Sequence, residues 1–353
     1  MKILLTGGGT AGHVVPHLAL LNGIRKNYDK IIYIGSKTGI EKDIIAKQND
    51  ITYYPITTTK FVRNKLFANL LIPFKLIGGV YQAKKIIKKE KPNIVFSKGG
   101  YVSLPVVYAA KRLKVPVVAH ESDLYMGLAN KLSLKSATVL CTTFEKTASQ
   151  IKNKGVYTGS PIREEQIKSK AEGLKQLGIN TTKPILVITG GSLGSRFINN
   201  KIREEIKPIT DRFYCLHLTG RNNIDPALSN IKDYKQLEFV SDMGSVLACA
   251  DVVVSRAGSN TIFELAFFKK PMLLIPLPKG NSRGDQVDNA NYFNQKGYAN
   301  FVTEDQLASS PILPYIMQTF NESARLKQTL EKANIKPAND KLLEIILKYS
   351  KKE

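Results

Sequence analysis

Short apolar runs rich in β-branched residues recur along the chain, and longer segments with helical spacing separate them. Within these runs the hydrophobicity is continuous instead of alternating. This pattern indicates strands that are buried on both faces, and therefore parallel strands covered by helices. The alternation of such strands with helices predicts an α/β fold with doubly wound sheets. The predicted strands span residues 2–6, 31–34, 94–97, 115–120 and 138–142 in the first half and 184–189, 213–218, 237–240, 251–255 and 272–276 in the second.

One sequence pattern occurs twice. "KILLT" leads into "GGGTAGH" at Gly7, and "PILVIT" leads into "GGSLGS" at Gly190, 183 residues later. Each is a buried strand followed by a glycine-rich turn and a helix, as in Rossmann-like domains. We therefore predict two such domains, 1–158 and 159–353, whose strand ends face a shared cleft. The tail, residues 321–353, is predicted to form two helices of the second domain, separated at Pro337.

The charge is large and unevenly distributed. The net charge is +23, and residues 1–158 hold 25 Lys and Arg against 8 Asp and Glu, whereas the remaining residues hold 27 against 21. A basic first half indicates an anionic partner: nucleic acid, an acidic membrane surface or a phosphorylated substrate. Nucleic acid is disfavoured because the basic residues are mostly lysine, tryptophan is absent and no RRM, KH or helix-turn-helix pattern occurs.

The sequence also indicates a compartment. Its first residues do not have the pattern of a signal peptide, and its most apolar window, 66–83, is interrupted by polar residues and proline. Three cysteines, Cys141, Cys215 and Cys249, lie in apolar surroundings without C-x-x-C spacing. We expect buried free thiols in a reducing compartment, and therefore a cytoplasmic protein.

The first glycine-rich loop matches G-x-G-x-x-G at Gly7, Gly9 and Gly12, a weak fingerprint of dinucleotide binding. An NAD enzyme also needs an acidic residue at the end of the second strand to hold the ribose. Ser36 and Lys37 stand there instead, which leaves an NADP enzyme as an alternative. His13 follows the loop at the start of a predicted helix, where the helix dipole favours the neutral imidazole. It is either a general base or a histidine with a local hydrogen bond.

A second polar cluster, "SRAGSNTIFE" at residues 255–264, begins at a predicted strand end and includes Glu264. Shortly after it, "GDQVDNA" places Gln286 and Asn289 three positions apart, on one face of a predicted helix. Amides and a carboxylate suit sugar hydroxyls and a ribose better than they suit a metal. The four histidines show no zinc-type spacing.

Seven motifs together resemble one family. "GGGTAGHVVP", "SKGGYVSLP", "HESDLYMGLANK", "TGSPIR", "GGSLGS", "SRAGSNTIFE" and "GDQVDNA" occur in its order and spacing, from residue 2 to about residue 297. The family is the bacterial undecaprenyl-diphospho-muramoylpentapeptide β-N-acetylglucosaminyltransferases, the peptidoglycan glycosyltransferases that make lipid II. The resemblance implies a GT-B fold, an acceptor- and membrane-facing first domain and a UDP-sugar donor domain. It further implies inverting transfer of N-acetylglucosamine from its UDP donor to the C4 hydroxyl of the muramoyl sugar of lipid I, without a cofactor, at the cytoplasmic face of the membrane.

The resemblance also implies roles for individual residues. His13 is the family's candidate base, with Tyr101 and Glu121 nearby. Asp123, which stands where many members have asparagine, is a second candidate base, and Ala11 replaces a frequent glycine. Thr10, Ala11 and Gly12 would approach the reacting sugar and the acceptor diphosphate. On the donor side, Glu264 would bind the ribose, Ser259, Asn260 and Thr261 the diphosphate, Ser192 and Arg163 the phosphate or nucleoside, Val240 the uracil, and Gln286 and Asn289 the sugar hydroxyls.

The chemistry is consistent with these residues. Inverting transfer needs a base on the acceptor hydroxyl and stabilisation of a departing diphosphate, which a helix N-terminus and an arginine can supply. No D-x-D cluster occurs in these motifs, so we expect no protein-bound metal. Another sugar-nucleotide enzyme, such as a glycolipid glucosyltransferase or a UDP-N-acetylglucosamine epimerase, is the main alternative.

The segment from Lys60 to Lys91 suggests a membrane contact. It holds nine basic residues and a single acid, Glu90. One apolar stripe has helical spacing and is predicted to face the core: Leu76, Val80, Ala83 and Ile87. The apolar residues ahead of it lack that spacing: Phe67, Leu70, Leu71, Ile72 and Phe74. We expect an exposed patch ringed by lysines that binds an anionic membrane surface, the alternative being a buried loop.

Overall fold

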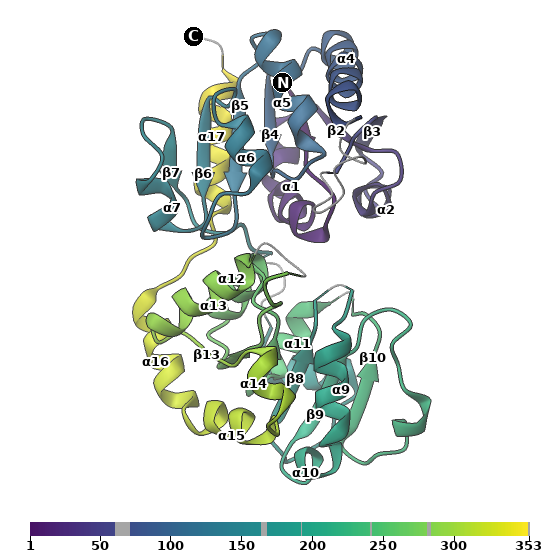
Figure 1. Cartoon of the computed structure of the whole chain (residues 1–353), viewed down its shortest axis with the longest axis vertical. Coiled ribbons are helices and arrows are strands. Elements are labelled where there is room, and N and C mark those ends of the chain that lie inside the picture. Colours follow the sequence, from purple (N-terminus) through teal and green to yellow (C-terminus); the bar gives the residue numbers. More distant parts are fainter. Residues whose placement is uncertain (61–70, 164–167, 192, 241, 281–283, 352–353) are drawn as a thin grey trace. The chain divides into compact units, whose positions relative to one another are not determined.

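The computed structural model describes residues 1–60, 71–163, 168–191, 193–240, 242–280 and 284–351 (Figure 1). The chain forms two compact units. The first comprises Met1–Arg163 and Pro337–Glu353, and the second comprises Glu164–Lys336. The predicted division after residue 158 lies close to the first boundary. The assignment of the whole remaining chain to the second domain differs from the structure, because the C-terminal segment belongs to the first unit.

The first unit contains a seven-stranded sheet in which every pair of neighbouring strands is parallel. Across the sheet the strands are β3 (Ile51–Ile56), β2 (Lys30–Ser36), β1 (Lys2–Thr6), β4 (Ile94–Ser97), β5 (Val117–Glu121), β6 (Val139–Thr142) and β7 (Gly155–Tyr157). The helices described are η1 (Ala11–His13), α1 (Val15–Asn27), α2 (Ile40–Ile45), α4 (Ile72–Glu90), α5 (Ser103–Arg112), α6 (Leu128–Ser133), α7 (Glu145–Ser149) and α17 (Asn339–Ser350).

Both faces of this sheet are buried, as the continuous apolar runs predict. On one face, Ile3 and Leu5 pack in a core cluster with residues of α1 and α17. On the other face, Leu4 packs in a second cluster with Ala83 of α4 and Val106 of α5. Successive residues of β1 therefore contribute to different cores, because side chains of a strand alternate between its two faces.

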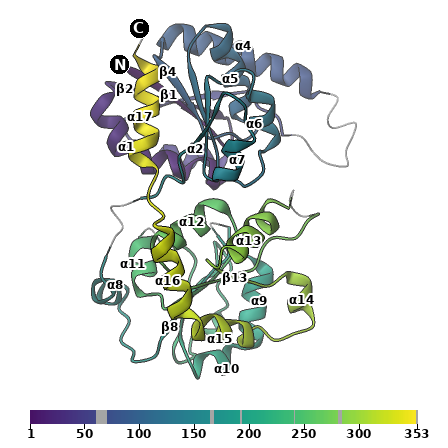
Figure 2. The same ribbon diagram turned by 90° about the vertical axis from the view of Figure 1, so that its left-hand side faces the viewer.

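The C-terminal helix α17 lies alongside α1 (Figures 1 and 2). Its apolar residues Leu342 and Ile346 are fully buried in the first unit's core. At its end, the Ser350 hydroxyl lies 2.5 Å from the Tyr28 hydroxyl. The prediction of two tail helices separated at Pro337 is confirmed by α16 and α17, but their shared assignment to the second domain is wrong. Local sequence shows an amphipathic helix without showing which sheet it covers.

The second unit repeats this architecture with six parallel strands. Across the sheet the strands are β10 (Tyr234–Leu237), β9 (Tyr214–Leu218), β8 (Ile185–Thr189), β11 (Val252–Ser255), β12 (Met272–Leu274) and β13 (Asn300–Phe301). The helices described are α8 (Lys170–Leu177), α9 (Arg196–Glu204), α10 (Ile206–Thr210), η3 (Pro226–Leu228), α11 (Met243–Cys249), α12 (Ser259–Phe267), α13 (Asp285–Gln295), α14 (Glu304–Ala308), α15 (Leu313–Asn321) and α16 (Ser323–Ala333).

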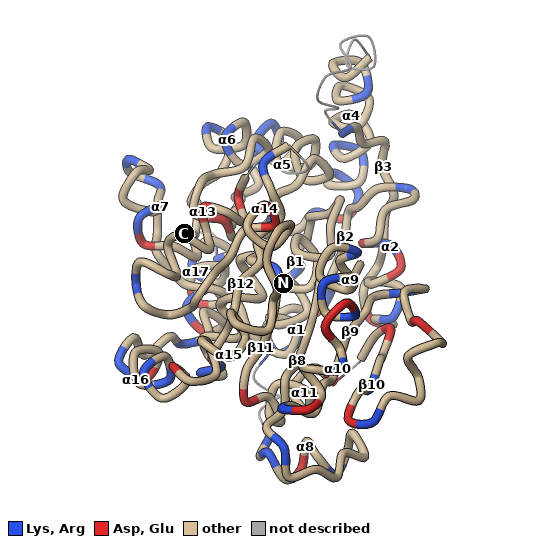
Figure 3. The backbone as a smooth tube through the Cα atoms, turned by 60° about the horizontal axis from the view of Figure 1, so that its bottom comes forward, with Lys and Arg blue, Asp and Glu red and all other residues tan. Residues whose placement is uncertain are grey.

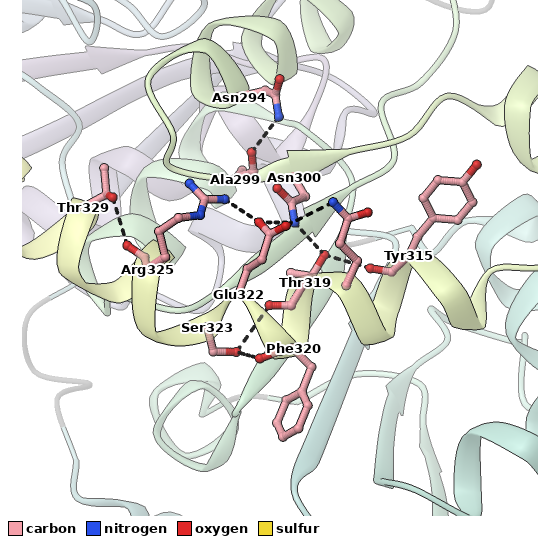
Figure 4. A network of polar contacts seen from close by, with 11 residues as sticks. Asn294, Ala299, Asn300, Tyr315, Thr319, Phe320, Glu322, Ser323, Arg325 and Thr329 are labelled. Atoms are coloured by element: carbon pink, nitrogen blue, oxygen red, sulfur yellow. Dashed lines mark hydrogen bonds and ion pairs between the residues drawn. The ribbon is translucent and has the colours of Figure 1, made fainter.

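A polar network holds the corner between α15 and α16 against β13 (Figure 4). The Glu322 carboxylate accepts hydrogen bonds from the side chains of Asn300 at 3.3 Å and Gln318 at 3.1 Å, and it pairs with Arg325. Asn300 belongs to β13, so this carboxylate ties the edge strand to both helices. The pairing lowers the pKa of Glu322, chiefly through Arg325.

Most of the predicted strands are confirmed, and the exceptions are at sheet edges. The strand predicted at 237–240 instead occupies Tyr234–Leu237, where the Tyr234 hydroxyl lies 2.8 Å from Nδ1 of the buried His217. The edge strands β3, β7 and β13 were not predicted. β3 is exposed or half-buried along most of its length and includes Pro55, so it lacks the apolar run of a central strand. All three cysteines are free and buried, as predicted.

Candidate functional site

The glycine-rich loop of the first unit follows β1 directly and requires glycine at successive positions. Gly9 has φ +88°, and a Cβ there would lie 2.5 Å from the ring of Tyr101. A Cβ on Gly8 would lie 2.6 Å from the carboxyl carbon of Glu41. The Tyr33 hydroxyl donates to the carbonyl of Gly7 at 2.7 Å. The loop is therefore closely packed on all these sides, which explains its composition.

Glu41 of α2 is fully buried beneath this loop. Its carboxylate accepts hydrogen bonds from the backbone N–H of Gly9 at 3.2 Å, from the backbone N–H of Ser36 at 3.0 Å and from the Ser36 hydroxyl. Lys37, which the NADP alternative requires as a phosphate ligand, is exposed. A buried carboxylate on a loop N–H disfavours a pyrophosphate at that point, so the geometry argues against a dinucleotide enzyme.

A second glycine turn lies against the first. Gly99 and Gly100 follow β4 with φ values of +81° and +77°. A Cβ on Gly100 would lie 2.2 Å from the carbonyl oxygen of Gly8 and 3.4 Å from Cγ of His13. The structure therefore brings the predicted residues His13 and Tyr101 to the same pair of glycine turns, at the carboxyl edge of the sheet.

His13 ends a short 3₁₀ turn, η1, that precedes α1. Its Nδ1 lies 2.8 Å from the hydroxyl of Thr10, and the side chain is half-buried. Thr10 and Gly12 are exposed and Ala11 is half-buried, so this stretch is accessible from solvent. The contact with Thr10 is the local hydrogen bond that the sequence left as an alternative.

The turn after β5 carries the other two candidate acidic residues, and they differ in their surroundings. Glu121 is buried, and its carboxylate accepts hydrogen bonds from the N–H of Asp123 at 3.1 Å, the N–H of Gly127 at 2.8 Å and the side chain of Asn130 at 2.9 Å. Asp123 is half-buried. This geometry gives Glu121 the role of holding the turn, and it favours Asp123 over Glu121 as the carboxylate that reaches a substrate.

A residue that the sequence analysis did not single out, Lys98, lies between these elements. It follows β4, and its Nζ lies 2.6 Å from Nδ1 of His120 and 2.7 Å from the hydroxyl of Ser122. Burial lowers the pKa of Lys98 to about 7 and the pKa of His120 well below its ordinary value. The signal in the sequence was a lysine placed directly after a buried strand and ahead of two glycines.

The second unit repeats the glycine turn after β8. A Cβ on Gly190 would lie 2.2 Å from the backbone nitrogen of Ser195, and one on Gly194 would lie 2.1 Å from the carbonyl oxygen of Thr219. Ser195 begins α9 and accepts a hydrogen bond from the N–H of Ile198 at 3.3 Å. Ser192, predicted to contact the sugar donor, lies outside the described residues.

Arg256, also absent from the predicted set, holds the turn after β11. Its guanidinium donates to the hydroxyl of Ser195 at 2.7 Å and to the carbonyl of Ile275 at 3.0 Å, and it pairs with Glu304 at 2.5 Å. Both charged side chains are mostly buried. The turn that precedes α12 is therefore tied to the ends of three other elements, which fixes the direction of that helix.

The N-terminus of α12 presents the polar residues predicted for a diphosphate. Gly258 precedes the helix, Ser259 is buried, and Asn260 and Thr261 are half-buried. The first backbone N–H groups of a helix have no partner within it and favour an anion. Glu264 is half-buried and lies one turn further along α12, so the diphosphate and ribose candidates share one helix.

The remaining predicted residues have mixed surroundings. Gln286 is half-buried and accepts a hydrogen bond from the N–H of Leu277 at 3.0 Å, whereas Asn289 is fully buried and donates to the carbonyl of Ala257 at 3.3 Å. Asn289 therefore also supports the turn before α12. Val240 is half-buried, next to an exposed Phe239. Arg163, half-buried, ends the first segment of the first unit, whereas the other donor-side candidates belong to the second unit.

Within the part of the chain that the structure describes, no three or more His, Cys, Asp and Glu residues gather in a way that could hold a metal ion.

Comparison with known families agrees with this two-unit architecture. The glycosyltransferase family 28 N-terminal domain matches residues 3–142, and the glycosyltransferase family 28 C-terminal domain matches residues 185–344. Among solved structures, the chain is similar to MurG of Acinetobacter baumannii, with a TM-score of 0.76, 25% identity and coverage of 98% of this chain and 99% of the other. The calicheamicin glycosyltransferase CalG4 shares the fold alone, with a TM-score of 0.73 at 13% identity over 99% of this chain and 97% of that one.

These matches and the two Rossmann-like units define a glycosyltransferase of the GT-B fold. Among curated proteins, the chain is 46% identical to a Clostridium botulinum protein over 99% of this chain and 98% of that one, and 45% identical to a Clostridium novyi protein over 99% of both. Each is a UDP-N-acetylglucosamine–N-acetylmuramyl-(pentapeptide) pyrophosphoryl-undecaprenol N-acetylglucosamine transferase. The chain belongs to this family.

Proposed function

We propose that this chain transfers N-acetylglucosamine from UDP-N-acetylglucosamine to the C4 hydroxyl of the muramoyl sugar of lipid I, which gives lipid II. The observation that carries the proposal is the identity of 46% with a named transferase over 99% of the chain. The glycine turns and polar strand ends of both units lie within the matched length. In the reaction, the acceptor oxygen attacks the anomeric carbon with inversion, a base takes the hydroxyl proton, and UDP leaves with the electron pair of the broken bond.

The second unit supplies the groups suited to the sugar donor. The N–H groups at the start of α12, with the hydroxyls of Ser259 and Thr261, would stabilise the negative charge that develops on the departing diphosphate. Glu264 would accept hydrogen bonds from the ribose hydroxyls. Arg256 is already paired with Glu304, so its role is to hold the turn that aims these groups.

The first unit supplies the groups suited to the acceptor. His13 and Asp123 are both half-buried, and each is accessible enough to take the proton. His13 follows the first glycine turn, and Asp123 lies in the turn after β5. We favour His13, because Thr10 orients its ring through Nδ1 and an imidazole accepts protons near neutral pH. Glu121 holds the backbone of the turn through its three hydrogen bonds.

The test is product analysis with UDP-N-acetylglucosamine and a lipid I analogue. The expected products are UDP and a β-1,4-linked disaccharide on the analogue. A glycolipid glucosyltransferase would accept a glucose donor instead, and an epimerase would convert the UDP-sugar without an acceptor. Either result would contradict the proposal.

Helix α4 supports a further part of the proposal, contact with an anionic membrane surface. Leu71, just before the helix, is 58% exposed, and Phe74, Ile77 and Tyr81 are 72%, 67% and 71% exposed on one helical face. Three of the four residues of the predicted core stripe lie at the core, because Ala83 and Ile87 are buried and Val80 packs against the same cluster. The fourth, Leu76, is half-buried and lies outside that cluster. Ile72 is half-buried, and Phe67 and Leu70 lie outside the described residues. The alternative of a buried loop is therefore wrong for Leu71 and Phe74.

The charges of α4 fit the same interpretation (Figure 3). Its only acid, Glu90, turns inward, where it pairs with Lys30 at 2.7 Å and accepts a hydrogen bond from the Tyr54 hydroxyl at 2.5 Å. Among the described residues, no helix is both long enough and apolar enough to span a membrane. The proposal is peripheral binding through the apolar tips and these exposed lysines: Lys75, Lys85, Lys88, Lys89 and Lys91.

A further inference from the structure

The first unit buries a lysine to which the proposed transfer chemistry gives no role. Lys98 is 2% exposed at the carboxyl edge of the sheet, directly after β4. Lysine is almost never fully buried unless it is paired. Here both hydrogen-bond partners of its ammonium group, Nδ1 of His120 and the hydroxyl of Ser122, are uncharged. A buried cation without a direct carboxylate partner is costly, so the fold keeps it at the expense of stability.

The hydrogen bonds have a defined direction. Nε2 of His120 lies 3.1 Å from the carbonyl oxygen of Gly159 and must donate its proton to it. Because burial keeps this histidine neutral, its Nδ1 is an acceptor and takes one N–H of Lys98. A second N–H is donated to the oxygen of Ser122. Lys98 therefore connects the end of β4 to β5 and to the turn that β5 enters.

Lys98 also lies next to the start of the glycine loop. Its backbone N–H donates to the carbonyl of Thr6 at 2.9 Å, and a Cβ on Gly7 would lie 3.2 Å from its own Cβ. Ser122 immediately precedes Asp123, whose negative charge acts on the Lys98 ammonium group. One buried residue thus adjoins both segments that carry the candidate bases: its backbone lies beside the start of the loop before His13, and its ammonium group reaches the turn with Asp123.

We propose that Lys98 is a positioning residue for the acceptor side of the transfer. Anchored on His120, its ammonium group holds Ser122 and thereby fixes the turn with Asp123 beside the glycine loop. Its positive charge also attracts the carboxylates of Glu121 and Asp123 and so helps to hold the turn that carries them. This inference rests on the proposed function, and it adds a residue to the reaction without changing the substrates.

The positioning role of Lys98 can be measured because the charge of its side chain changes within an accessible pH range. Burial lowers the pKa of Lys98 to about 7, against the smaller opposing effects of Glu121 and Asp123. Below that pH the ammonium form holds the turn through its hydrogen bonds and its charge. Above it the neutral amine keeps two N–H donors for His120 and Ser122 but no longer attracts the two carboxylates. The titratable and charged groups that face it come from α1, β5, the turn after β5 and β6: His17, His120, Glu121, Asp123 and Cys141.

The experiment compares the native enzyme with Lys98→Met from pH 6 to 8.5, using UDP-N-acetylglucosamine and a lipid I analogue. At pH 6 we expect kcat of the variant to be 10- to 100-fold lower, with KM for the UDP-sugar within threefold of native. The ratio of native to variant kcat should fall as the pH rises through 7 and level off above 1, because the neutral amine keeps both hydrogen bonds, which methionine cannot make. The variant should melt at or above the native temperature, because methionine fills the same space without a buried charge.

Two further variants separate positioning from packing. Lys154→Met removes a half-buried lysine whose Nζ donates to the carbonyls of Leu134 and Ala137 away from the glycine loops, and its kcat should stay within twofold of native. Ser122→Ala should lower kcat, and the double variant with Lys98→Met should be no slower than Lys98→Met alone.

A ratio of native to Lys98→Met kcat near 1 at every pH would overturn the inference. A ratio that does not change with pH would overturn it as well, and so would a Lys98→Met protein that melts at a lower temperature than the native protein. Turnover of the native enzyme is measured first. A native enzyme that makes no disaccharide contradicts the proposed function, whereas an active native enzyme with an equally active Lys98→Met contradicts this inference alone.

Discussion

The backbone N–H of Gly9 donates to the carboxylate of Glu41, which lies 32 residues away in the sequence and is fully buried. A backbone N–H of the glycine-rich loop is therefore already hydrogen-bonded to a carboxylate of the same unit. The loop of a dinucleotide-binding domain keeps such groups for a pyrophosphate. The G-x-G-x-x-G spacing of the first unit thus serves close packing around His13 and Tyr101. The groups that we propose for the nucleotide diphosphate belong to the second unit.

This relationship gives a prediction for stability. Glu41→Gln replaces one acceptor oxygen with an NH₂ group, which cannot accept from Gly9 or from Ser36. Buried donors lose their partners, so the free energy of unfolding should fall by about 2–4 kcal/mol. Chemical denaturation measures the change. Glu344→Gln, an exposed change on α17, should stay within about 0.5 kcal/mol of native, and an equal loss in both variants would contradict the role given to Glu41.

Glu264 is predicted to act on the sugar donor. Glu264→Ala removes a charge-assisted hydrogen bond to the ribose worth ~1.5–3 kcal/mol, so KM for UDP-N-acetylglucosamine should rise roughly 10- to 100-fold. Steady-state kinetics with each substrate varied in turn checks this. Glu331→Ala, exposed on α16, is the matched control and should behave as native. A rise in the KM of the acceptor alone would show that the assignment is wrong.

The two candidate bases are distinguished by a pair of variants. His13→Ala should lower kcat on the order of 10²–10⁴-fold if the imidazole takes the acceptor proton, with UDP binding nearly intact. Asp123→Asn keeps the shape of the side chain and should retain most activity. Single-turnover rates, with a UDP thermal shift as the binding readout, make the comparison. Loss of turnover in Asp123→Asn together with an active His13→Ala would exchange the two roles.

The membrane proposal is tested on the exposed face of α4. Changing Leu71, Phe74 and Ile77 together to serine should weaken binding to vesicles containing anionic lipid on the order of 10- to 100-fold, because the apolar tips no longer enter the interface. Binding of the native protein should also fall as salt increases. Vesicle sedimentation measures both effects, and UDP binding should not change. Ile224→Ser, a partly exposed apolar position in the second unit, is the control. Unchanged vesicle binding of the triple variant would place the contact elsewhere.

Burial of Lys98 predicts how stability depends on pH. The pKa of Lys98 is about 7 in the folded protein and 10.5, its ordinary value, in the unfolded chain. Between these values the unfolded chain binds more protons, so rising pH favours the folded state, and the destabilising effect is complete below pH 7. Lys98→Met lacks this effect. Its gain in Tm over native should therefore be largest at pH 6–7 and shrink toward pH 9.5 in differential scanning calorimetry. A gain that is constant with pH would contradict the lowered pKa.

Much of the architecture followed from the sequence, because it depends on local signals. Continuous apolar runs indicate buried parallel strands wherever they occur, and a glycine-rich stretch directly after such a run indicates a tight turn at the carboxyl edge. The two Rossmann-like units, the glycine turns at Gly7 and Gly190 and the helix that follows "SRAGS" were all accessible in this way. The edge strand β3 was missed, since an edge position removes the apolar run on which the prediction relies.

The tertiary structure alone decided which polar groups turn inward. Glu41 meets Gly9 across 32 residues, and Arg256 meets Ser195 across 61, so no local pattern distinguishes these buried side chains from solvated ones. The same holds for Lys98, whose surroundings come from β5 and the turn that follows it, more than 20 residues away. Helix α17 joined the first unit for the same reason. Periodicity specifies that a helix has an apolar face, and only the packed fold specifies which sheet that face covers.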